Sequence, residues 1–322
     1  MEKLFLGVDT SNYTTSLALC AGGRVIKNVR RLLPVSDGAC GLRQSDAVFL
    51  HTKALPELAE TLFSAPEYRP ENLVGIGVSI APRDALGSYM PCFLAGLSFA
   101  AGIAGSHGLP LYRFSHQAGH VMAGIMSSGC PSVFAGEFLS FHVSGGTTEA
   151  LFVKPRGASF SFEVVGGTSD ASAGQIIDRA GVRLALAFPC GKALDALSLK
   201  STKALPVCVS MKDGYFSLSG LQNRFERYME KGETPADGAA FLFESIGCAL
   251  ERATVALRER YGKTLPVLYA GGVMCNSRIR SRLSRLTEAY FASPELSSDN
   301  ACGTALLCER AACSEHGKEN AC

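Results

Sequence analysis

Two stretches of the chain share one pattern, in which short apolar runs flank a polar turn. Apolar runs at 139–143 and 150–153 enclose Ser144, Gly145, Gly146, Thr147 and Thr148, which predicts a strand, a tight turn and a returning strand. Residues 4–19 have the same layout around a turn that carries Asp9, Thr10 and Ser11. Two hairpins of this kind, far apart in the chain, predict an internal duplication that offers two turns to one cleft.

The turn at 144–148 has residues suited to binding phosphate. Paired glycines can adopt positive φ and direct successive N–H groups at an anion, while Ser and Thr hydroxyls add uncharged donors. For this turn alone, an ordinary glycine-rich hairpin is the alternative. The second copy favours the phosphate interpretation.

The remaining pattern predicts an α/β fold in which helices and strands alternate. Apolar residues recur at helical spacing in 46–62, where Pro56 interrupts the pattern, and further helices are predicted at 90–104 and 239–258. Buried strands are predicted at 73–80, 110–114 and 266–270. Residues 30–46 are polar, contain Pro34, Gly38 and Gly41, and are predicted to form a loop.

A pair of histidines follows the strand at 110–114. Ser115 has the position of an N-cap, and His116 and His120 then share one face of the helix. This spacing suits a divalent metal ion, and two hydrogen-bonded histidines at a domain boundary are the alternative. A metalloprotease helix would have Glu after the first histidine, but Gln117 occupies that position. Peptide hydrolysis is therefore disfavoured.

His142 is a candidate for a further metal ligand. Alternate residues of a strand point to the same side, so Ser140, His142 and Ser144 share a face. Ser144 belongs to the phosphate turn, and we therefore expect His142 near the ion, as a ligand or beside one.

Polar residues in the second half of the chain extend the candidate site. Asp170 precedes a predicted helix and suits a cap, whereas Asp178, further along, is the better functional candidate. Asn276 follows a strand and a Gly-Gly turn, where a nucleotide could lie on bare backbone. Asp299 caps the last helix or binds metal. Three arginines are predicted to line one face of a helix, namely Arg278, Arg282 and Arg285. This face is either a solvated surface or a contact with RNA.

Composition narrows the class of protein. The 322 residues are enough for two domains, and 47% are hydrophobic. A net charge of +2 does not indicate a nucleic-acid binder, but it allows a local basic patch. The twelve cysteines form no CxxC pair, and most of them are expected to be small buried side chains rather than zinc ligands. Without a signal peptide or a long apolar run, we expect a soluble, cytoplasmic protein with no membrane contact.

Taken in order, these motifs resemble those of the TsaD/Gcp family, once called O-sialoglycoprotein endopeptidase, over nearly the whole chain. They are Gly7-Val-Asp-Thr-Ser, His116-x-x-x-His120, Val143-Ser-Gly-Gly-Thr-Thr, Asp178, Pro189-x-Gly191, Phe216-Ser-x-Ser-Gly220, Ala270-Gly-Gly-Val-x-x-Asn276 and Ser298-Asp-Asn300. The resemblance implies an actin-like, sugar-kinase (ASKHA) fold with two ribonuclease-H-like domains around a nucleotide cleft. The first domain would comprise residues 1–127 and be completed by a helix at 298–322, and the second domain would comprise residues 128–297.

The resemblance also implies an activity: transfer of the threonylcarbamoyl group from threonylcarbamoyl-AMP to N6 of the adenosine beside the anticodon in tRNA. One divalent ion, iron or zinc, would be held by His116, His120 and Asp299, and it would polarise the carbamoyl carbonyl. The adenylate, or ATP or ADP, would lie against Ser144 to Thr148, Asp178, Gly191, Asp195 and Asn276. Implied partners are tRNA, a TsaB-like paralogue that docks on the N-terminal domain, and a TsaE-like ATPase.

Several positions depart from the family pattern. A Pro-Glu-Leu-Ala-Ser-Arg motif before His51 is missing, Gln175 replaces a Glu, and Cys190 replaces a Gly. These changes suggest a divergent paralogue. They leave open two alternatives, a nucleotide-binding scaffold or regulator without transferase activity, and a carbamoyltransferase with another acceptor.

Overall fold

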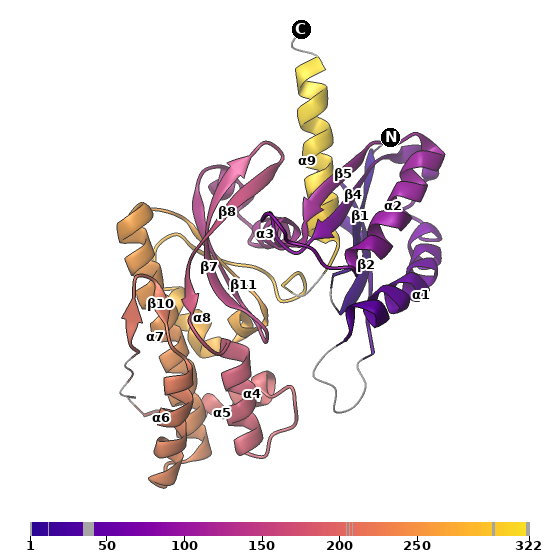
Figure 1. Cartoon of the computed structure of the whole chain (residues 1–322). Coiled ribbons are helices and arrows are strands. Elements are labelled where there is room, and N and C mark those ends of the chain that lie inside the picture. Colours follow the sequence, from indigo (N-terminus) through magenta and orange to yellow (C-terminus); the bar gives the residue numbers. More distant parts are fainter. Residues whose placement is uncertain are drawn as a thin grey trace. The chain divides into compact units, whose positions relative to one another are not determined.

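The computed structural model describes residues 2–11, 13–34, 42–203, 205, 207, 209–297 and 300–319. The chain divides into two compact units, shown in Figure 1. The first unit contains Met1–Gly129, Pro155–Ser161 and Glu295–Cys322, and the second contains Cys130–Lys154 and Phe162–Pro294.

A five-stranded sheet forms the centre of the first unit, in the order β3-β2-β1-β4-β5. The first three strands form an antiparallel meander, whereas β4 and β5 run parallel to β1. The bounds are β1 (Leu4–Asp9), β2 (Thr14–Ala21), β3 (Arg24–Leu32), β4 (Leu73–Ala81) and β5 (Leu111–Ser115). The β1–β2 pairing confirms the first predicted hairpin.

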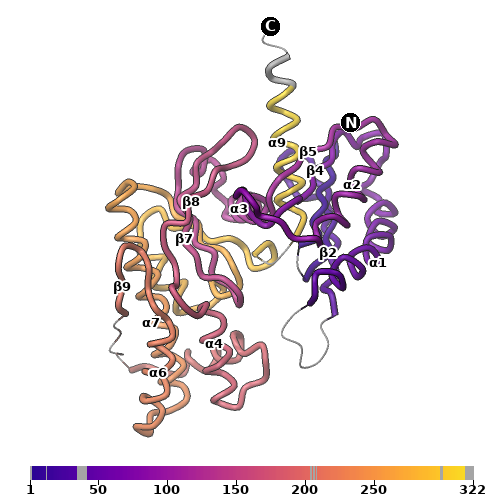
Figure 2. Tube along the Cα trace, in the orientation of Figure 1, coloured from indigo at the N-terminus to yellow at the C-terminus, as the bar shows by residue number. Residues whose placement is uncertain are grey.

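Helices cover both faces of this sheet. The leucines and valines of β1, β2 and β4 form one core with α1 (Gln44–Phe63) and α2 (Phe93–His107), and the 3₁₀ turn η1 (Pro70–Asn72) precedes β4. On the other face lie α3 (His116–Ser127) and α9 (Cys302–Glu319), which contacts β1, β2 and β4 (Figure 2). Close approach of α9 requires glycine in the sheet, because a Cβ on Gly7 would lie 2.4 Å from the carbonyl oxygen of Ala301.

The second sheet repeats the topology of the first. Its order is β12-β11-β6-β7-β8-β10-β9, so β8-β7-β6-β11-β12 corresponds to β3-β2-β1-β4-β5. As in the first sheet, β6 pairs antiparallel with β7 and parallel with β11. This repetition confirms the predicted duplication and the α/β class. The bounds are β6 (Phe138–Val143), β7 (Thr148–Arg156), β8 (Ser159–Thr168), β9 (Met211–Lys212), β10 (Tyr215–Phe216), β11 (Val267–Ala270) and β12 (Ala289–Phe291).

Alternate residues of β6, namely Leu139, Phe141 and Val143, face a large core formed with the helices of the second unit. Phe138, on the opposite side of the strand, packs edge-on against Phe134 of η2. The helical segments are η2 (Pro131–Ala135), α4 (Ala173–Arg183), α5 (Gly191–Ser198), α6 (Ser219–Glu230), α7 (Pro235–Tyr261), η3 (Gly272–Cys275) and α8 (Ser277–Leu283).

The structure corrects two predicted boundaries. The predicted loop at 30–46 is wrong at both ends, because β3 extends to Leu32 and α1 begins at Gln44. Residues 35–41 lie outside the described part of the chain.

The helix α1 continues through Pro56, although proline in a helix interior costs about 3 kcal/mol. Burial of Leu55, Leu58 and Leu62 against the sheet outweighs this cost.

Candidate functional site

The turn between β6 and β7 exposes two amide groups. Its ends are closed by the Ser144 N–H, which donates to the Thr147 carbonyl (2.8 Å), and by the Thr147 N–H, which donates to the Ser144 hydroxyl (3.1 Å). Gly145 and Gly146 are exposed, with nothing within 4 Å of where a Cβ would be. Among the described residues, neither glycine N–H has an acceptor. These two donors could bind an anion, as the sequence predicted.

The corresponding turn of the first unit is buried. Asp9, Thr10 and Ser11 are each at most 2% exposed. The Thr10 hydroxyl donates to the Cys92 carbonyl (3.0 Å) and accepts the Gly96 N–H (3.1 Å), so it holds the start of α2 against β1. Ser11 Oγ has no partner among the described residues, which leaves one buried hydroxyl at this turn available to a ligand.

Asp9 connects this turn to the predicted metal helix. Its Oδ1 accepts the Ser11 N–H (2.9 Å), and its Oδ2 lies 2.8 Å from His116 Nδ1. Burial alone would raise the pKa of Asp9, but His116 and hydrogen bonds from Ser11 and Ser79 lower it below its ordinary value. An ionised Asp9 accepts a hydrogen bond from Nδ1–H of His116, so the lone pair of the neutral imidazole lies on Nε2.

The helix that carries the two histidines forms as predicted. The Ser115 hydroxyl caps α3 by accepting the Ala118 N–H (3.1 Å). The rings of His116 and His120 lie edge to face with their centroids 4.3 Å apart. A carboxylate on Nδ1 with Nε2 as donor atom is the usual arrangement for a metal-binding histidine, so His116 fits that role.

The other two predicted metal ligands are Asp299 and His142. Asp299 lies outside the described residues, and His142 is a half-buried residue of β6 in the second unit, opposite Glu149 on β7. Within the described ranges, no three His, Cys, Asp or Glu side chains form a group that could hold an ion.

Asp178 holds the loop that leads into α5. Its Oδ1 accepts the Cys190 N–H (2.9 Å), next to the half-buried Gly191 at the start of the helix. The side chain of Cys190 packs on Gly181 of α4, where a Cβ would lie 2.2 Å from that of Cys190. Asp178 therefore fixes the backbone of the predicted nucleotide loop.

Asp195 and Asn276 are brought together. Asn276 Nδ2 donates to Asp195 Oδ1 (2.7 Å), and the Asn276 side-chain oxygen accepts the Ile279 N–H as the cap of α8. Asp195 Oδ2 also accepts the hydroxyl of Ser277 (2.9 Å). The two predicted nucleotide residues thus join α5 to the start of α8.

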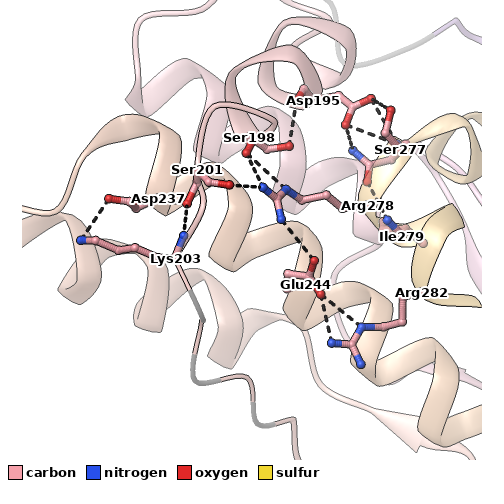
Figure 3. Close-up of polar contacts among 11 residues, drawn as sticks. Asp195, Ser198, Ser201, Lys203, Asp237, Glu244, Ser277, Arg278, Ile279 and Arg282 are labelled. Carbon is pink, nitrogen blue, oxygen red and sulfur yellow. Dashed lines mark hydrogen bonds and ion pairs between the residues drawn. The ribbon is translucent and has the colours of Figure 1, made fainter.

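Two of the three arginines predicted to line one helix face bond to other parts of the second unit. Arg278 donates to the carbonyls of Ser198 and Ser201, both at 2.7 Å (Figure 3). Arg282 pairs with Glu244 (3.0 Å) and Glu251 (2.7 Å) of α7. Only Arg285 of the three is exposed. The interpretation as a solvated face is wrong for Arg278 and Arg282, because both side chains are half-buried and bond to groups of α5 and α7.

Asp170 caps a helix, but not the one expected. Ser172 caps α4, whereas Asp170 accepts bonds from the Leu218 N–H (2.9 Å) and the Ser217 hydroxyl (2.6 Å) at the start of α6. Partial burial would raise the pKa of Asp170, but these bonds and those from Ser219 and Thr168 lower it well below its ordinary value. The carboxylate stabilises the turn that leads into α6.

We expect Asp170→Asn to lower the free energy of unfolding by about 1 kcal/mol at neutral pH, the usual cost of losing a helix cap. Because the folded-state pKa lies below the unfolded value of about 3.9, the contribution is present above about pH 4 and lost as the pH falls below it. Urea denaturation at a series of pH values should therefore show that the free energy of unfolding falls less steeply with decreasing pH in the variant than in the wild type. Asp213→Asn, at an exposed site in the same unit, is the control; equal losses in both variants would refute the capping role.

Buried cysteines behave as the composition predicted. Cys20, Cys302 and Cys308 are buried in the first unit, and burial raises the pKa of Cys302 to about 12. A thiol with such a pKa remains protonated and packs as a small apolar side chain. In the described part of the chain, no helix combines the length and apolar character needed to cross a membrane.

Sequence reasoning missed the residues that support the Ser144–Thr147 turn. Ser172 and Gln175 form a capping box at the start of α4, and Gly174 packs directly under Gly145. A signal was present in the sequence, because Ser followed three residues later by Gln is the pattern of a capping box.

Comparison with known proteins agrees with this architecture. Residues 42–306 match the family model "TsaD: tRNA N6-adenosine threonylcarbamoyltransferase". A curated relative of that name from Enterococcus faecalis is 31% identical over 293 residues, which cover 88% of this chain and 80% of the relative.

Solved structures show the fold. HypF from T. kodakarensis aligns with a TM-score of 0.61 at 12% identity, over 98% of this chain and 48% of HypF. Component A of the (R)-2-hydroxyglutaryl-CoA dehydratase of Acidaminococcus fermentans aligns with a TM-score of 0.58 at 18% identity, over 96% and 99% of the two chains. The predicted actin-like, sugar-kinase fold is confirmed. Because residues 42–306, which are most of the chain, match the family model, the chain belongs to the TsaD family.

Proposed function

We propose that this protein is an acyltransferase that moves the threonylcarbamoyl group of threonylcarbamoyl-AMP to N6 of the adenosine beside the anticodon in tRNA. The observation that carries the proposal is the family match over residues 42–306, together with a curated relative of that activity. The open amides of Gly145 and Gly146 support it, since an adenylate phosphate needs such donors.

In this proposal the second unit binds the adenylate. The Ser144–Thr148 turn receives the phosphate, with its hydroxyls as further donors. Asp178 and Gly191 set the backbone of the neighbouring loop, and the Asp195–Asn276 pair fixes the start of α8. Asp9, Thr10 and Ser11 form the phosphate loop of the first unit, in which Asp9 and Thr10 position other groups and Ser11 has an unpartnered hydroxyl.

A divalent ion, iron or zinc, would be held by His116, His120 and Asp299, with His142 as a further candidate. The ion would supply a Lewis acid for the carbamoyl oxygen. The residues of this chain prepare the site, since Asp9 sets the tautomer of His116 and Ser115 caps the helix that carries both histidines.

Partners follow from the same proposal. The acceptor is tRNA, and a TsaB-like paralogue and a TsaE-like ATPase would complete the reaction cycle, with the first docked on the N-terminal unit. Such a system would operate in the cytoplasm, where tRNA is modified.

Deleting the gene in its source organism tests the proposal. Mass spectrometry of digested tRNA should show loss of N6-threonylcarbamoyladenosine, restored by the wild-type gene but not by His116→Ala. An unchanged level of the modified nucleoside after deletion would refute the proposal and favour a regulatory paralogue.

A further inference from the structure

The exposed turn of the second unit is attached to the first residues of α4. The Ser144 carbonyl accepts the Gly174 N–H (3.2 Å), and the Gly145 carbonyl accepts the Ser172 hydroxyl (2.5 Å). At the end of the turn, Thr148 Oγ1 accepts the Ala173 N–H (2.9 Å). Three consecutive residues of one segment therefore each hold a different residue of the turn.

Steric fit makes this attachment specific. A Cβ on Gly174 would lie 2.5 Å from the Cα of Gly145 and 2.7 Å from the Ser144 carbonyl oxygen. Both neighbours are backbone atoms, which cannot move aside as a flexible side chain could. Any side chain at position 174 would therefore displace the turn from α4.

The hydrogen bonds divide the turn into an anchored side and an open side. The first amides of α4 are used: Ala173 and Gly174 donate to the turn, and Gln175 donates to the Ser172 hydroxyl (3.3 Å). The start of α4 therefore has no amide among these three left for an anion. The amides of Gly145 and Gly146 lack an acceptor among the described residues, so a ligand of this turn meets them instead.

We propose that Ser172 and Gly174 are positioning residues for the phosphate-binding turn, an inference that rests on the proposed adenylate site. They fix the Ser144 and Gly145 carbonyls against α4, and this orients the Gly145 and Gly146 amides toward the adenylate phosphate. Such preorganisation increases affinity because the backbone is already ordered before the ligand binds.

Hydrogen exchange tests the positioning without any ligand. In Gly174→Ala and Ser172→Ala, the amides of Ser144 and Thr147 should exchange about three- to tenfold faster, as expected when one supporting hydrogen bond is lost. Ser172→Thr keeps the hydroxyl and should restore slow exchange. Gly102→Ala, at an exposed helical glycine of α2 with nothing within 4 Å, controls for the glycine-to-alanine change. Unchanged exchange in Gly174→Ala and Ser172→Ala would overturn the inference.

Calorimetric titration with ADP adds the functional readout. Gly174→Ala should bind ADP at least about tenfold more weakly, since small displacements of preorganised groups have large effects. Ser172→Ala should bind about three- to tenfold more weakly, whereas Ser172→Thr and Gly102→Ala should match the wild type. Equal affinity in all variants would overturn the inference. If the wild type itself does not bind ADP, the proposed adenylate site fails, and the exchange result alone decides the positioning role.

Discussion

Replacing Asp9 with Asn should reduce metal affinity about 10- to 100-fold, the usual effect of losing the carboxylate behind a histidine ligand. Asp9 accepts from both Ser11 and His116, and Asn has only one side-chain oxygen to offer them. With that oxygen facing the fixed Ser11 N–H, the amide NH₂ faces His116 Nδ1. The ring proton then moves to Nε2, the nitrogen that an ion would need.

Metal content after dialysis against a graded chelator series measures this effect, and nitrogen NMR of the metal-free protein reports the His116 tautomer. Asp46→Asn, an exposed carboxylate at the start of α1, is the matched control and should retain metal like the wild type. Unchanged metal retention and an unchanged tautomer in Asp9→Asn would show that Asp9 is only a structural partner of His116.

Gly7→Ala should lower the free energy of unfolding by about 3 kcal/mol or more, at the upper end for overpacked cores. The added Cβ would lie 2.4 Å from the carbonyl oxygen of Ala301 and 2.6 Å from the amide nitrogen of Ala305. Both belong to the backbone at the start of α9, so the helix itself must move. Urea denaturation followed by circular dichroism measures the loss.

Gly102→Ala again serves as the comparison, because its Cβ would meet open space and alanine favours a helix by up to about 1 kcal/mol. It should leave stability unchanged or raise it. A Gly7→Ala protein as stable as the wild type would mean that α9 is not packed tightly on β1.

Local patterns in the sequence were sufficient for much of the fold. Both hairpins, the α3 cap at Ser115 and the turn before Asn276 depend on neighbouring residues, and all were predicted. The duplication could be recognised because both copies keep the arrangement of apolar runs and polar turn. Repetition of the strand order in the two sheets follows from this shared pattern.

Contacts between distant residues could not be predicted in the same way. Asp170 caps α6 through partners 47 to 49 residues away, and Arg278 bonds with Ser198, 80 residues away. Charge spacing along one helix does not identify such partners. For the same reason, the sequence alone did not show that the Thr10 hydroxyl is used by α2.

Two departures from the family pattern have structural explanations. Gln175 accepts the Ser172 N–H (3.3 Å) in a capping box, a role that Glu and Gln both perform. Cys190 fits because Gly181 faces it without a side chain. Neither change removes a group from the candidate site, so neither favours a scaffold over an enzyme. The altered segment before His51 remains the main departure.

The most direct measurement is transfer itself. Purified protein with its TsaB-like partner would be given threonylcarbamoyl-AMP labelled in the threonine, together with a tRNA that reads codons starting with A. We expect label in N6-threonylcarbamoyladenosine, and none when the adenosine beside the anticodon is replaced by guanosine. Absence of label from tRNA, with a folded protein that binds ADP and retains its metal, would contradict the account.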